Sequence, residues 1–516
     1  MTLDLPFVLT AVFFLALLVI ASWGMRRTQN TSDFFLGGRT LGPWVLAISY
    51  GTSYFSAVVF IGFAGQYGWL CGFGGLWVGL FNALAGGALA WLVLGRMTRK
   101  MTQRMGAMTM PEFFAKRYNS NGMKIITAIV IFVFLLPYSA SVFSGLGYLF
   151  KHIFGLQLST AITIITIVTG LYVVFGGYKA AARIDFIQGV IMFFGALLMV
   201  WFVLAKFGAP QEAVQKAFDA WQARVAQGAA GADAPLDAVK PIPAYILWSV
   251  VFMTSFATWG LPQMVHKYYA IKDESQIVRG AVITTIFALV IGCGAYFCGG
   301  LTHLLPTEQL SAAISDVSGK DVIDTNRLVP IMLIYALPGP LLALILLLVL
   351  SASMSTLSSL ALVSSSAVSI DLYKGYAVTG KSEKHYLRVM RFLCAVFVIL
   401  SWLIAIFNPA WIVPLMSLAW GSVAGAFLAP YLYGLFWRGT TKAGAYAGMF
   451  TGLILSNGIF FYRYFAMSPQ AARSFSPVSA SIAMVVPLVV VPLVSVMTAK
   501  VDSEVVDKAF GDQPQQ

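Results

Sequence analysis

The chain alternates between apolar stretches and short polar connections from its beginning to about residue 498. An α-helix needs about 20 apolar residues to cross the hydrocarbon core of a bilayer. Thirteen such stretches occur, at residues 5–24, 43–64, 74–95, 125–150, 157–177, 185–205, 243–265, 280–302, 341–372, 387–407, 410–437, 443–462 and 477–498. The pattern predicts an all-α integral membrane protein with thirteen transmembrane helices.

Lysines and arginines gather in alternate connections. Those on one side carry Arg26, Arg27, Arg39, Arg96, Arg99, Lys100, Arg104, Lys116, Arg117, Lys124, Lys179, Arg183, Lys267, Lys272, Arg279, Lys374, Lys381, Lys384, Arg388, Arg438 and Lys442. The short opposite connections 65–73 and 408–409 carry neither residue type. Because basic connections stay in the cytoplasm, we expect a multi-pass protein of a bacterial-type inner (plasma) membrane, with the N-terminus outside and the tail 501–516 cytoplasmic.

Composition narrows the class of protein. Of the 516 residues, 59% are hydrophobic and 10% are charged, which is too apolar for a soluble domain. In a membrane protein the location of the positive charges matters more than their sum of +13, so we expect no nucleic-acid partner. GxxxxGK(S/T), HExxH and Ser/His/Asp groupings are absent from the sequence, so we expect neither an enzyme nor an ATP-driven pump. No obligate protein partner is evident.

The stretch 350–366, LSASMSTLSSLALVSSS, carries nine hydroxyl side chains where a membrane helix is normally apolar. Helical spacing places on one patch Ala352, Ser355, Thr356, Ser358 and Ser359. Hydroxyl oxygens are neutral ligands for a hard cation, and a small alanine lets a backbone carbonyl approach as well. Such hydroxyls can also bond carbonyls of their own helix, so the residues alone leave both interpretations open.

Two predicted helices contain interruptions. The second has a polar middle from Ser49 to Ser56 that includes Gly51, and the seventh contains Gly260 and Pro262. If the first helix is peripheral, these are the first and sixth helices of a ten-helix core of five plus five. Interrupted helices at corresponding positions indicate a midplane binding site, although Gly and Pro can also simply kink a helix.

One acidic residue lies close to the hydroxyl-rich region. Asp185 opens the sixth predicted helix, where it either caps the helix or supplies the carboxylate of a cation site. No Lys or Arg is clearly placed at the membrane midplane. The longer connection 206–242 predicts an exposed, partly helical segment, and 328–337 predicts a short external or re-entrant helix. We expect the polar residues 499–516 to be disordered.

Four motifs resemble the sodium:solute symporter family: DFFLGGRTLGPW (33–44), MTMPEFFAKRY (108–118), GGYKAAARIDFIQG (176–189) and ASMSTLSSLALVSSSAVSIDLY (352–373). They follow the family order over about residues 5–440. The resemblance implies one polytopic domain over 1–500 with a five-plus-five inverted-repeat (LeuT-type) core and an extra N-terminal helix. The repeats are expected at about 41–205 and 243–437.

The resemblance also implies ligands for Na⁺. The first site would use the backbone carbonyls of Thr52, Phe55 and Ala352 with the hydroxyls of Ser355 and Thr356. A second site, which some family members have, would use Asp185, Ser355, Ser358 and Ser359. All of these residues are of the right type, so we expect two sodium ions per cycle.

The solute pocket departs from the family patterns. Tyr54 and Val59 replace the acid of the proline branch and the glutamine of the galactose branch, and threonines replace two aromatic residues before Pro262. Candidate lining residues, each equally explained by helix packing, are Tyr54, Ser56, Val59, Asn82, Tyr138, Ser141, Thr258 and Trp259.

We therefore expect a sodium-coupled secondary active symporter that imports a small organic solute, an amino acid or organic acid, by alternating access. Its partners would be the solute, Na⁺ and the lipid bilayer. Alternatives are a proton-coupled carrier of the same fold in which Asp185 titrates, and a non-transporting membrane sensor on this scaffold. A channel is less consistent with polar residues that gather at two breaks and one helical patch.

Overall fold

The computed structural model describes residues 5–27, 42–176, 178–228, 235, 237–317, 320–377, 380–407 and 410–511. Most of the first motif, with Arg39, lies outside the described residues, as do the connection 408–409 and the last residues of the tail.

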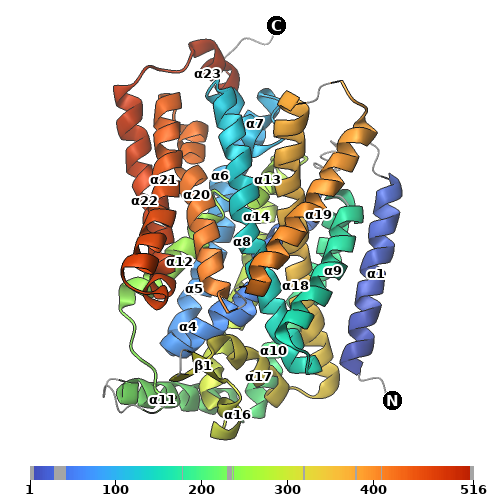
Figure 1. Ribbon diagram of the computed structural model, residues 1–516, viewed down its shortest axis with the longest axis vertical. Coiled ribbons are helices and arrows are strands. Elements are labelled where there is room, and N and C mark those ends of the chain that lie inside the picture. Colours follow the sequence, from blue (N-terminus) through green and yellow to red (C-terminus); the bar gives the residue numbers. More distant parts are fainter. Residues whose placement is uncertain are drawn as a thin grey trace.

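The described residues are mostly helical, and most of the long helices run in roughly the same direction along the bundle (Figure 1). The first half of the chain forms α1 (Leu5–Arg27), α3 (Pro43–Tyr54), η2 (Val58–Phe63), α4 (Ala64–Cys71), η3 (Gly72–Gly75), α5 (Leu76–Phe81), η4 (Asn82–Leu89), α6 (Ala90–Arg104), α7 (Met110–Arg117), α8 (Asn121–Phe154), α9 (Leu158–Gly176), α10 (Tyr178–Lys206) and α11 (Pro210–Gly228). The second half forms α12 (Ala244–Ala257), α13 (Pro262–Tyr269), α14 (Gln276–Ala288), η5 (Leu289–Cys293), α15 (Gly294–Leu301), η6 (Thr302–Leu304), α16 (Thr307–Ser311), β1 (Ile314–Val317), β2 (Lys320–Ile323), α17 (Thr325–Ala336), α18 (Gly339–Ser366), η7 (Ala367–Ala377), α19 (Glu383–Phe407), α20 (Ile412–Phe436), α21 (Lys442–Ala466), α22 (Pro469–Met497) and α23 (Ser503–Phe510).

Short elements cover the two ends of the bundle. The start of α1 lies at the lower end in Figure 1, together with α11, α16, α17 and the antiparallel hairpin β1–β2. The upper end carries α7 and α23. The predicted helices within 206–242 and 328–337 are confirmed as α11 and α17. The small hairpin was not predicted from the sequence.

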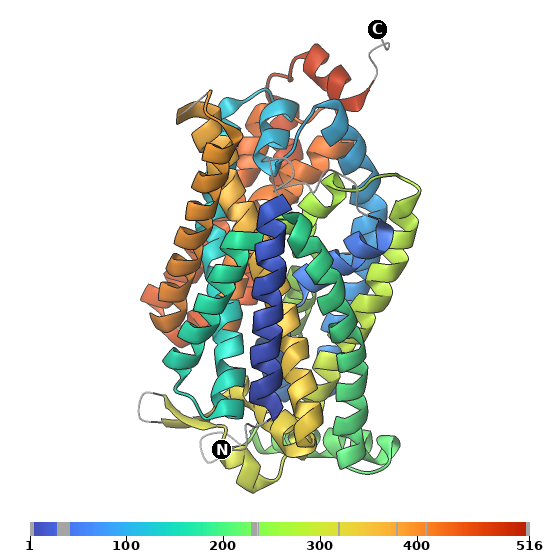
Figure 2. The same cartoon turned by 90° about the vertical axis from the view of Figure 1, so that its right-hand side faces the viewer.

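Ten helical stretches among the described residues are long and apolar enough to cross a membrane. The stretch Val58–Arg104 contains parts of two predicted spans, because the turn between them, η3, is itself a 3-10 helix. Two further apolar stretches, Leu5–Ile20 within α1 and Leu158–Val174 within α9, are shorter, at 10–17 residues. In Figure 2, α1 lies against the outside of the bundle, where it contacts α9, α10 and α18.

The hydroxyl-rich helix α18 lies at the centre of the packing. Every residue from Leu348 to Ser366 is buried, and α18 contacts α3, α8 and α10. Close approach of α10 to α3 depends on Gly189, since a Cβ there would lie 2.1 Å from Cγ2 of Ile48. Close packing at this point brings Asp185, one turn earlier on α10, next to α3.

Both predicted interruptions are present. Helix α3 ends at Tyr54, and Phe55 is extended, with φ −96° and ψ 134°, before the chain becomes helical again. Helix α12 ends at Ala257, and α13 begins at Pro262 after an extended Leu261. The extended residues turn some backbone carbonyls away from the helical hydrogen-bond pattern, which is the condition for using them as ligands.

The tail differs from its prediction, because Ser503–Phe510 forms the helix α23. Asp502 caps its N-terminus by accepting a hydrogen bond from the backbone N–H of Glu504. Arg104 of α6 donates to the carbonyl of Phe510, and Arg438, which follows α20, pairs with Asp507 at 3.4 Å. Sequence polarity alone does not predict this helix, since the arginines that hold it come from distant segments.

Candidate functional site

The first predicted ion site is assembled from α18 and the break after α3. Oγ of Ser355 donates to the carbonyl of Thr52 at 2.8 Å and lies 3.0 Å from the carbonyl oxygen of Ala352. Oγ1 of Thr356 lies 3.0 Å from the carbonyl of Ala352 and 3.2 Å from that of Phe55. The structure therefore brings together the five oxygen atoms that the family resemblance implies as Na⁺ ligands, and all five residues are buried.

Several carbonyl oxygens converge on the hydroxyl of Thr356. Oγ1 of Thr356 lies within 3.4 Å of four carbonyl oxygens, those of Thr52, Ser53, Phe55 and Ala352. A threonine hydroxyl has one proton, so it cannot satisfy four acceptors. A small cation can bind several such oxygens at once, because each is a neutral hard ligand.

Local hydrogen bonds hold the break open. The backbone N–H of Ala57 donates to Oγ of Ser353 on α18 at 2.9 Å, and Oγ of Ser56 accepts from the N–H of Val58 at 3.3 Å. These side chains cap the start of the second half-helix. A Cβ at Gly145 would lie 3.0 Å from Cβ of Ala57, so glycine allows α8 to pack against the same point. The break is thus stabilised by specific side-chain hydrogen bonds.

The residues of the second predicted ion site have other partners in this structure. Oδ2 of Asp185 accepts from Oγ of Ser49 at 2.5 Å and lies 3.7 Å from Nζ of Lys267. Oγ of Ser358 donates to the carbonyl of Ser355 on its own helix, and Ser359 shares a 2.9 Å hydrogen bond with Ser53. Among the hydrogen bonds of the described residues, none joins Asp185 to the α18 serines.

Lys267 is the residue that sequence reasoning missed. It was assigned to a cytoplasmic connection because the apolar stretch ends at residue 265, two positions earlier. Helix α13 continues to Tyr269, however, and Lys267 is 1% exposed. The signal that could have revealed it is the run of apolar and aromatic residues on both sides, MVHKYYAI, which extends the helix past the lysine.

The predicted solute residues lie around the two breaks. The Tyr54 hydroxyl donates to the carbonyl of Thr254, while Asn82 accepts from the hydroxyls of Thr254 and Ser255. Thr258 and Trp259 donate to backbone carbonyls of η4. All these bonds join the end of α12 to η4 or to Tyr54.

Three other candidates have local roles in this structure. Ser141 donates to the carbonyl of Tyr138 on its own helix, and Ser56 caps the break. Val59, 4% exposed, is an apolar packing residue.

An aromatic cluster adjoins the first break, and sequence reasoning missed its centre. Trp420 of α20 is 1% exposed. Its ring stacks with Tyr54 at 6.3 Å between centroids and meets Tyr138 edge-on at 5.6 Å. A single tryptophan in the small-residue run LAWGSVAGAF was the available signal. Three aromatic rings from α3, α8 and α20 thus form an apolar wall beside the break after α3.

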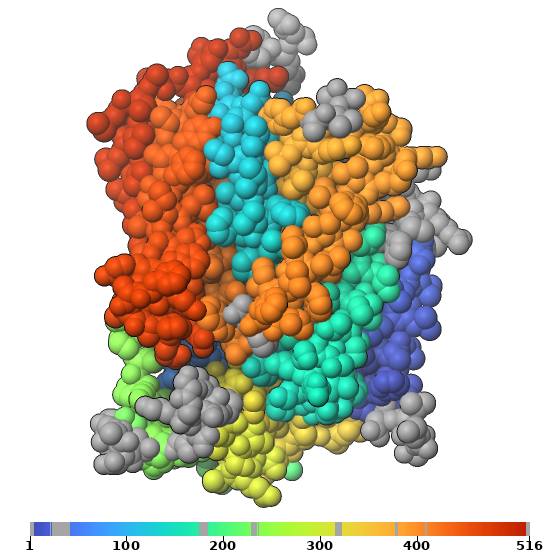
Figure 3. All heavy atoms as spheres, in the orientation of Figure 1, coloured from blue at the N-terminus to red at the C-terminus, as the bar shows by residue number. Residues whose placement is uncertain are grey.

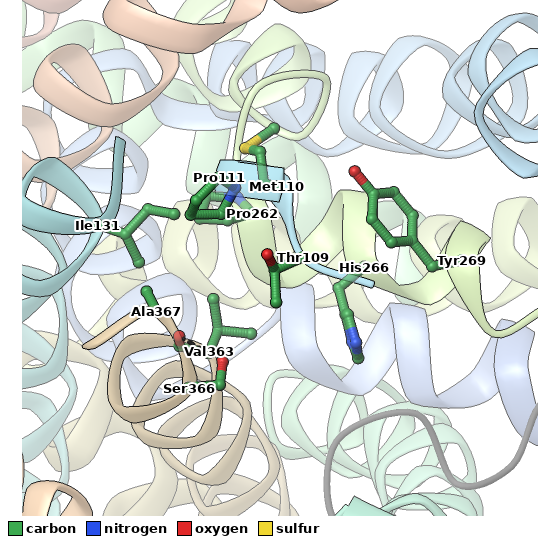
Figure 4. Close-up of a pocket in the computed structure, with 10 residues that line it drawn as sticks. All are labelled: Thr109, Met110, Pro111, Ile131, Pro262, His266, Tyr269, Val363, Ser366 and Ala367. Atoms are coloured by element: carbon green, nitrogen blue, oxygen red, sulfur yellow. Dashed lines mark hydrogen bonds between the residues drawn. The ribbon is translucent and has the colours of Figure 1, made fainter. Parts of the chain in front are cut away.

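Cavities differ between the two ends of the bundle. The lower end has a cavity of about 540 Å³, lined by residues of α4, β2, α17, α20 and α22 that include Gln66, Asp324 and Arg473. In the space-filling view, side chains of α8 and α19 cover the middle of the visible face (Figure 3). Toward the upper end, a cavity of only about 10 Å³ is lined by residues that include Thr109, His266, Tyr269, Val363 and Ser366 (Figure 4). The larger of these two cavities therefore lies at the lower end.

Comparisons with known proteins identify the family of the chain. The sodium:solute symporter family model matches residues 34–452. An osmoregulated proline transporter of Bacillus subtilis (strain 168) is 29% identical over 451 residues, covering 86% of each chain. A sodium/proline symporter of Staphylococcus aureus (strain bovine RF122 / ET3-1) is 30% identical over 465 residues, covering 87% of this chain and 84% of the relative.

Solved structures show the fold. A Na⁺-coupled sialic acid symporter, in a substrate-bound outward-open state, aligns with a TM-score of 0.73 at 17% identity, covering 96% of this chain and 98% of that one. A nucleobase-cation-symport-1 family transporter in a closed conformation aligns with a TM-score of 0.52 at 14% identity, covering 93% and 99%. Both share the LeuT-type transporter fold. The chain belongs to the sodium:solute symporter family and is a multi-pass membrane transporter.

Proposed function

We propose that the protein imports a small amino acid, with proline as the first candidate, by symport with Na⁺. The observation that carries the proposal is a group of five neutral oxygens: the hydroxyls of Ser355 and Thr356, the carbonyl of Ala352, and two carbonyls at the end of α3, those of Thr52 and Phe55. Among the described residues, no cluster of three or more His, Cys, Asp or Glu side chains could hold a metal ion. Neutral hard oxygens without a carboxylate suit a monovalent cation better than a divalent one.

The proposed coupling follows from the position of these oxygens. Na⁺ draws the carbonyls of Thr52 and Phe55 toward the hydroxyls of α18, which fixes the break in one geometry. The solute then binds between the two breaks, with its apolar part against Tyr54, Tyr138 and Trp420. Its carboxylate is bound by backbone N–H groups at a half-helix start. Na⁺ favours the solute-binding conformation because it makes these contacts with the break in that conformation and not in the others.

The proposed topology has thirteen spans, with α1 outside a five-plus-five core, the N-terminus outside the cell and the C-terminus in the cytoplasm. In this orientation the cavity of about 540 Å³ opens to the external side, and the cavity beside Thr109 and His266 lies on the release path. Basic residues at the upper end support the orientation, for example Arg96 and Lys100 near Glu274.

The test is uptake of radiolabelled proline, other small amino acids and organic acids into proteoliposomes. We expect uptake to require an inward Na⁺ gradient and to vanish when choline replaces Na⁺. Uptake that ignores Na⁺ but follows a pH gradient would contradict the proposal and favour a proton-coupled carrier that uses Asp185. Binding of solute without any uptake would favour a membrane sensor.

A further inference from the structure

A buried ion pair lies next to the proposed ion site. Asp185 of α10 and Lys267 of α13 are each 1% exposed, and their charged atoms are 3.7 Å apart. Ser49 of α3 lies between them, accepting from Nζ of Lys267 at 2.8 Å and donating to Oδ2 of Asp185 at 2.5 Å. The three side chains come from three different helices, and two of these, α3 before the first break and α13 after the second, contact each other.

The lysine occupies the role that a cation would have at this carboxylate. A buried carboxylate is costly without a positive partner, and an ammonium group and Na⁺ each supply one positive charge. Both charges together make the Asp185–Lys267 pair neutral. Among the described residues, Oδ1 of Asp185 has no hydrogen-bond partner, so the lysine and Ser49 act on the same oxygen, Oδ2.

The pair is also connected to the neutral oxygen site. Oγ1 of Thr52 donates to the carbonyl of Ser49 at 3.2 Å, and the carbonyl of Thr52 is one of the proposed Na⁺ ligands. Ser53, one residue further, links Ser359 of α18 to the carbonyl of Ser49. A cation that displaced Lys267 would therefore have to compete with a tethered ammonium group already bonded within this network.

We propose that Lys267 is the permanent counter-ion of Asp185, so that this transporter binds one Na⁺, at the neutral oxygens, instead of two. The inference rests on the proposed function and refines it, because it excludes Asp185 as a Na⁺ ligand while the lysine is present. It also makes Lys267 the residue that determines ion stoichiometry: replacing it with a neutral side chain creates a second cation site at Asp185.

The experiment counts Na⁺ bound at equilibrium by the full-length, detergent-purified protein, using radioactive Na⁺ alone as the probe. We expect one ion per chain for the wild type and for Asp185→Asn. Lys267→Met leaves the carboxylate without its partner, so it should bind two ions per chain at saturating Na⁺. The double variant Asp185→Asn/Lys267→Met has no charge at either position and should return to one ion.

The double variant guards against loss of folding. If Lys267→Met alone does not purify, the counts for the wild type, Asp185→Asn and the double variant still decide the question. Two ions in the wild type, falling to one in Asp185→Asn, would overturn the inference, because Asp185 would then be a ligand. One ion in a folded Lys267→Met would overturn it as well. No bound Na⁺ in the wild type would instead refute the proposed function.

Discussion

Replacing Thr356 by valine removes one oxygen from the proposed ion site while keeping the shape of the side chain. The lost hydroxyl lies 3.0–3.4 Å from four carbonyl oxygens, and no other side chain among the described residues is hydrogen-bonded to all four. Hydrogen bonds that involve a charged group contribute about 1.5–3 kcal/mol. Since about 1.4 kcal/mol corresponds to a tenfold change in affinity, the Na⁺ concentration for half-maximal uptake should rise about 10- to 100-fold.

The assay measures initial uptake against external Na⁺, together with the melting temperature in NaCl and in choline chloride at equal ionic strength. Na⁺ that binds only the folded state raises the melting temperature by mass action, so the variant should lose most of that shift. Thr356→Ser keeps the hydroxyl and should keep most of the affinity.

Ser365→Ala is the matched control for this prediction. Ser365 is buried on the same helix, but it donates to the carbonyl of Leu362 and accepts from Sγ of Cys394, away from the break. We expect its Na⁺ dependence to match the wild type. Equal weakening in Thr356→Val and Ser365→Ala would refute the reasoning, since it would show a general effect of altering α18 and no specific ion ligand.

Three further outcomes follow from the packing. Gly189→Ala places a Cβ 2.1 Å from Cγ2 of Ile48, so thermal unfolding should show a loss of about 1–3 kcal/mol, partly restored by adding Ile48→Ala. Trp420→Ala removes the ring that Tyr54 stacks on, and it should raise the solute concentration for half-maximal uptake while Na⁺ binding without solute stays unchanged. Gly260→Ala places a Cβ 2.8 Å from the backbone N of Leu428, so uptake rate should fall more than solute binding, as measured by transport against equilibrium binding.

The sequence predicts the helical fold well because apolar length and helical period are local properties. The oxygens of the proposed ion site were predicted only through the family resemblance. Helical spacing brings Ser355 and Thr356 together, but no local pattern places Thr52 beside them. Thr52 and Ser355 are 303 positions apart, and only the folded chain shows their 2.8 Å contact.

The charged pair shows why the rest could not be predicted. A lysine two residues beyond an apolar stretch resembles a loop residue, because hydropathy does not reveal which side of a helix is covered by neighbours. Burial of Lys267 depends on α6 and α3 packing against α13, and the sequence suggests only a helix cap or an ion ligand for its acid partner. The same limit applies to Trp420, whose importance comes from two aromatic residues on other helices.

The docked helix α23 has a practical consequence for handling the protein. It is held by Arg104 and Arg438, which belong to different halves of the chain, and the ring of Phe510 lies 5.3 Å from the guanidinium of Arg117. Gly511 then takes φ 84°, with the Arg104 guanidinium directly against it. A purification tag or fluorescent reporter should therefore start after Gly511. Truncating the chain at residue 500 to aid crystallisation would remove α23 and its contacts with Arg104, Arg117 and Arg438 at the upper end.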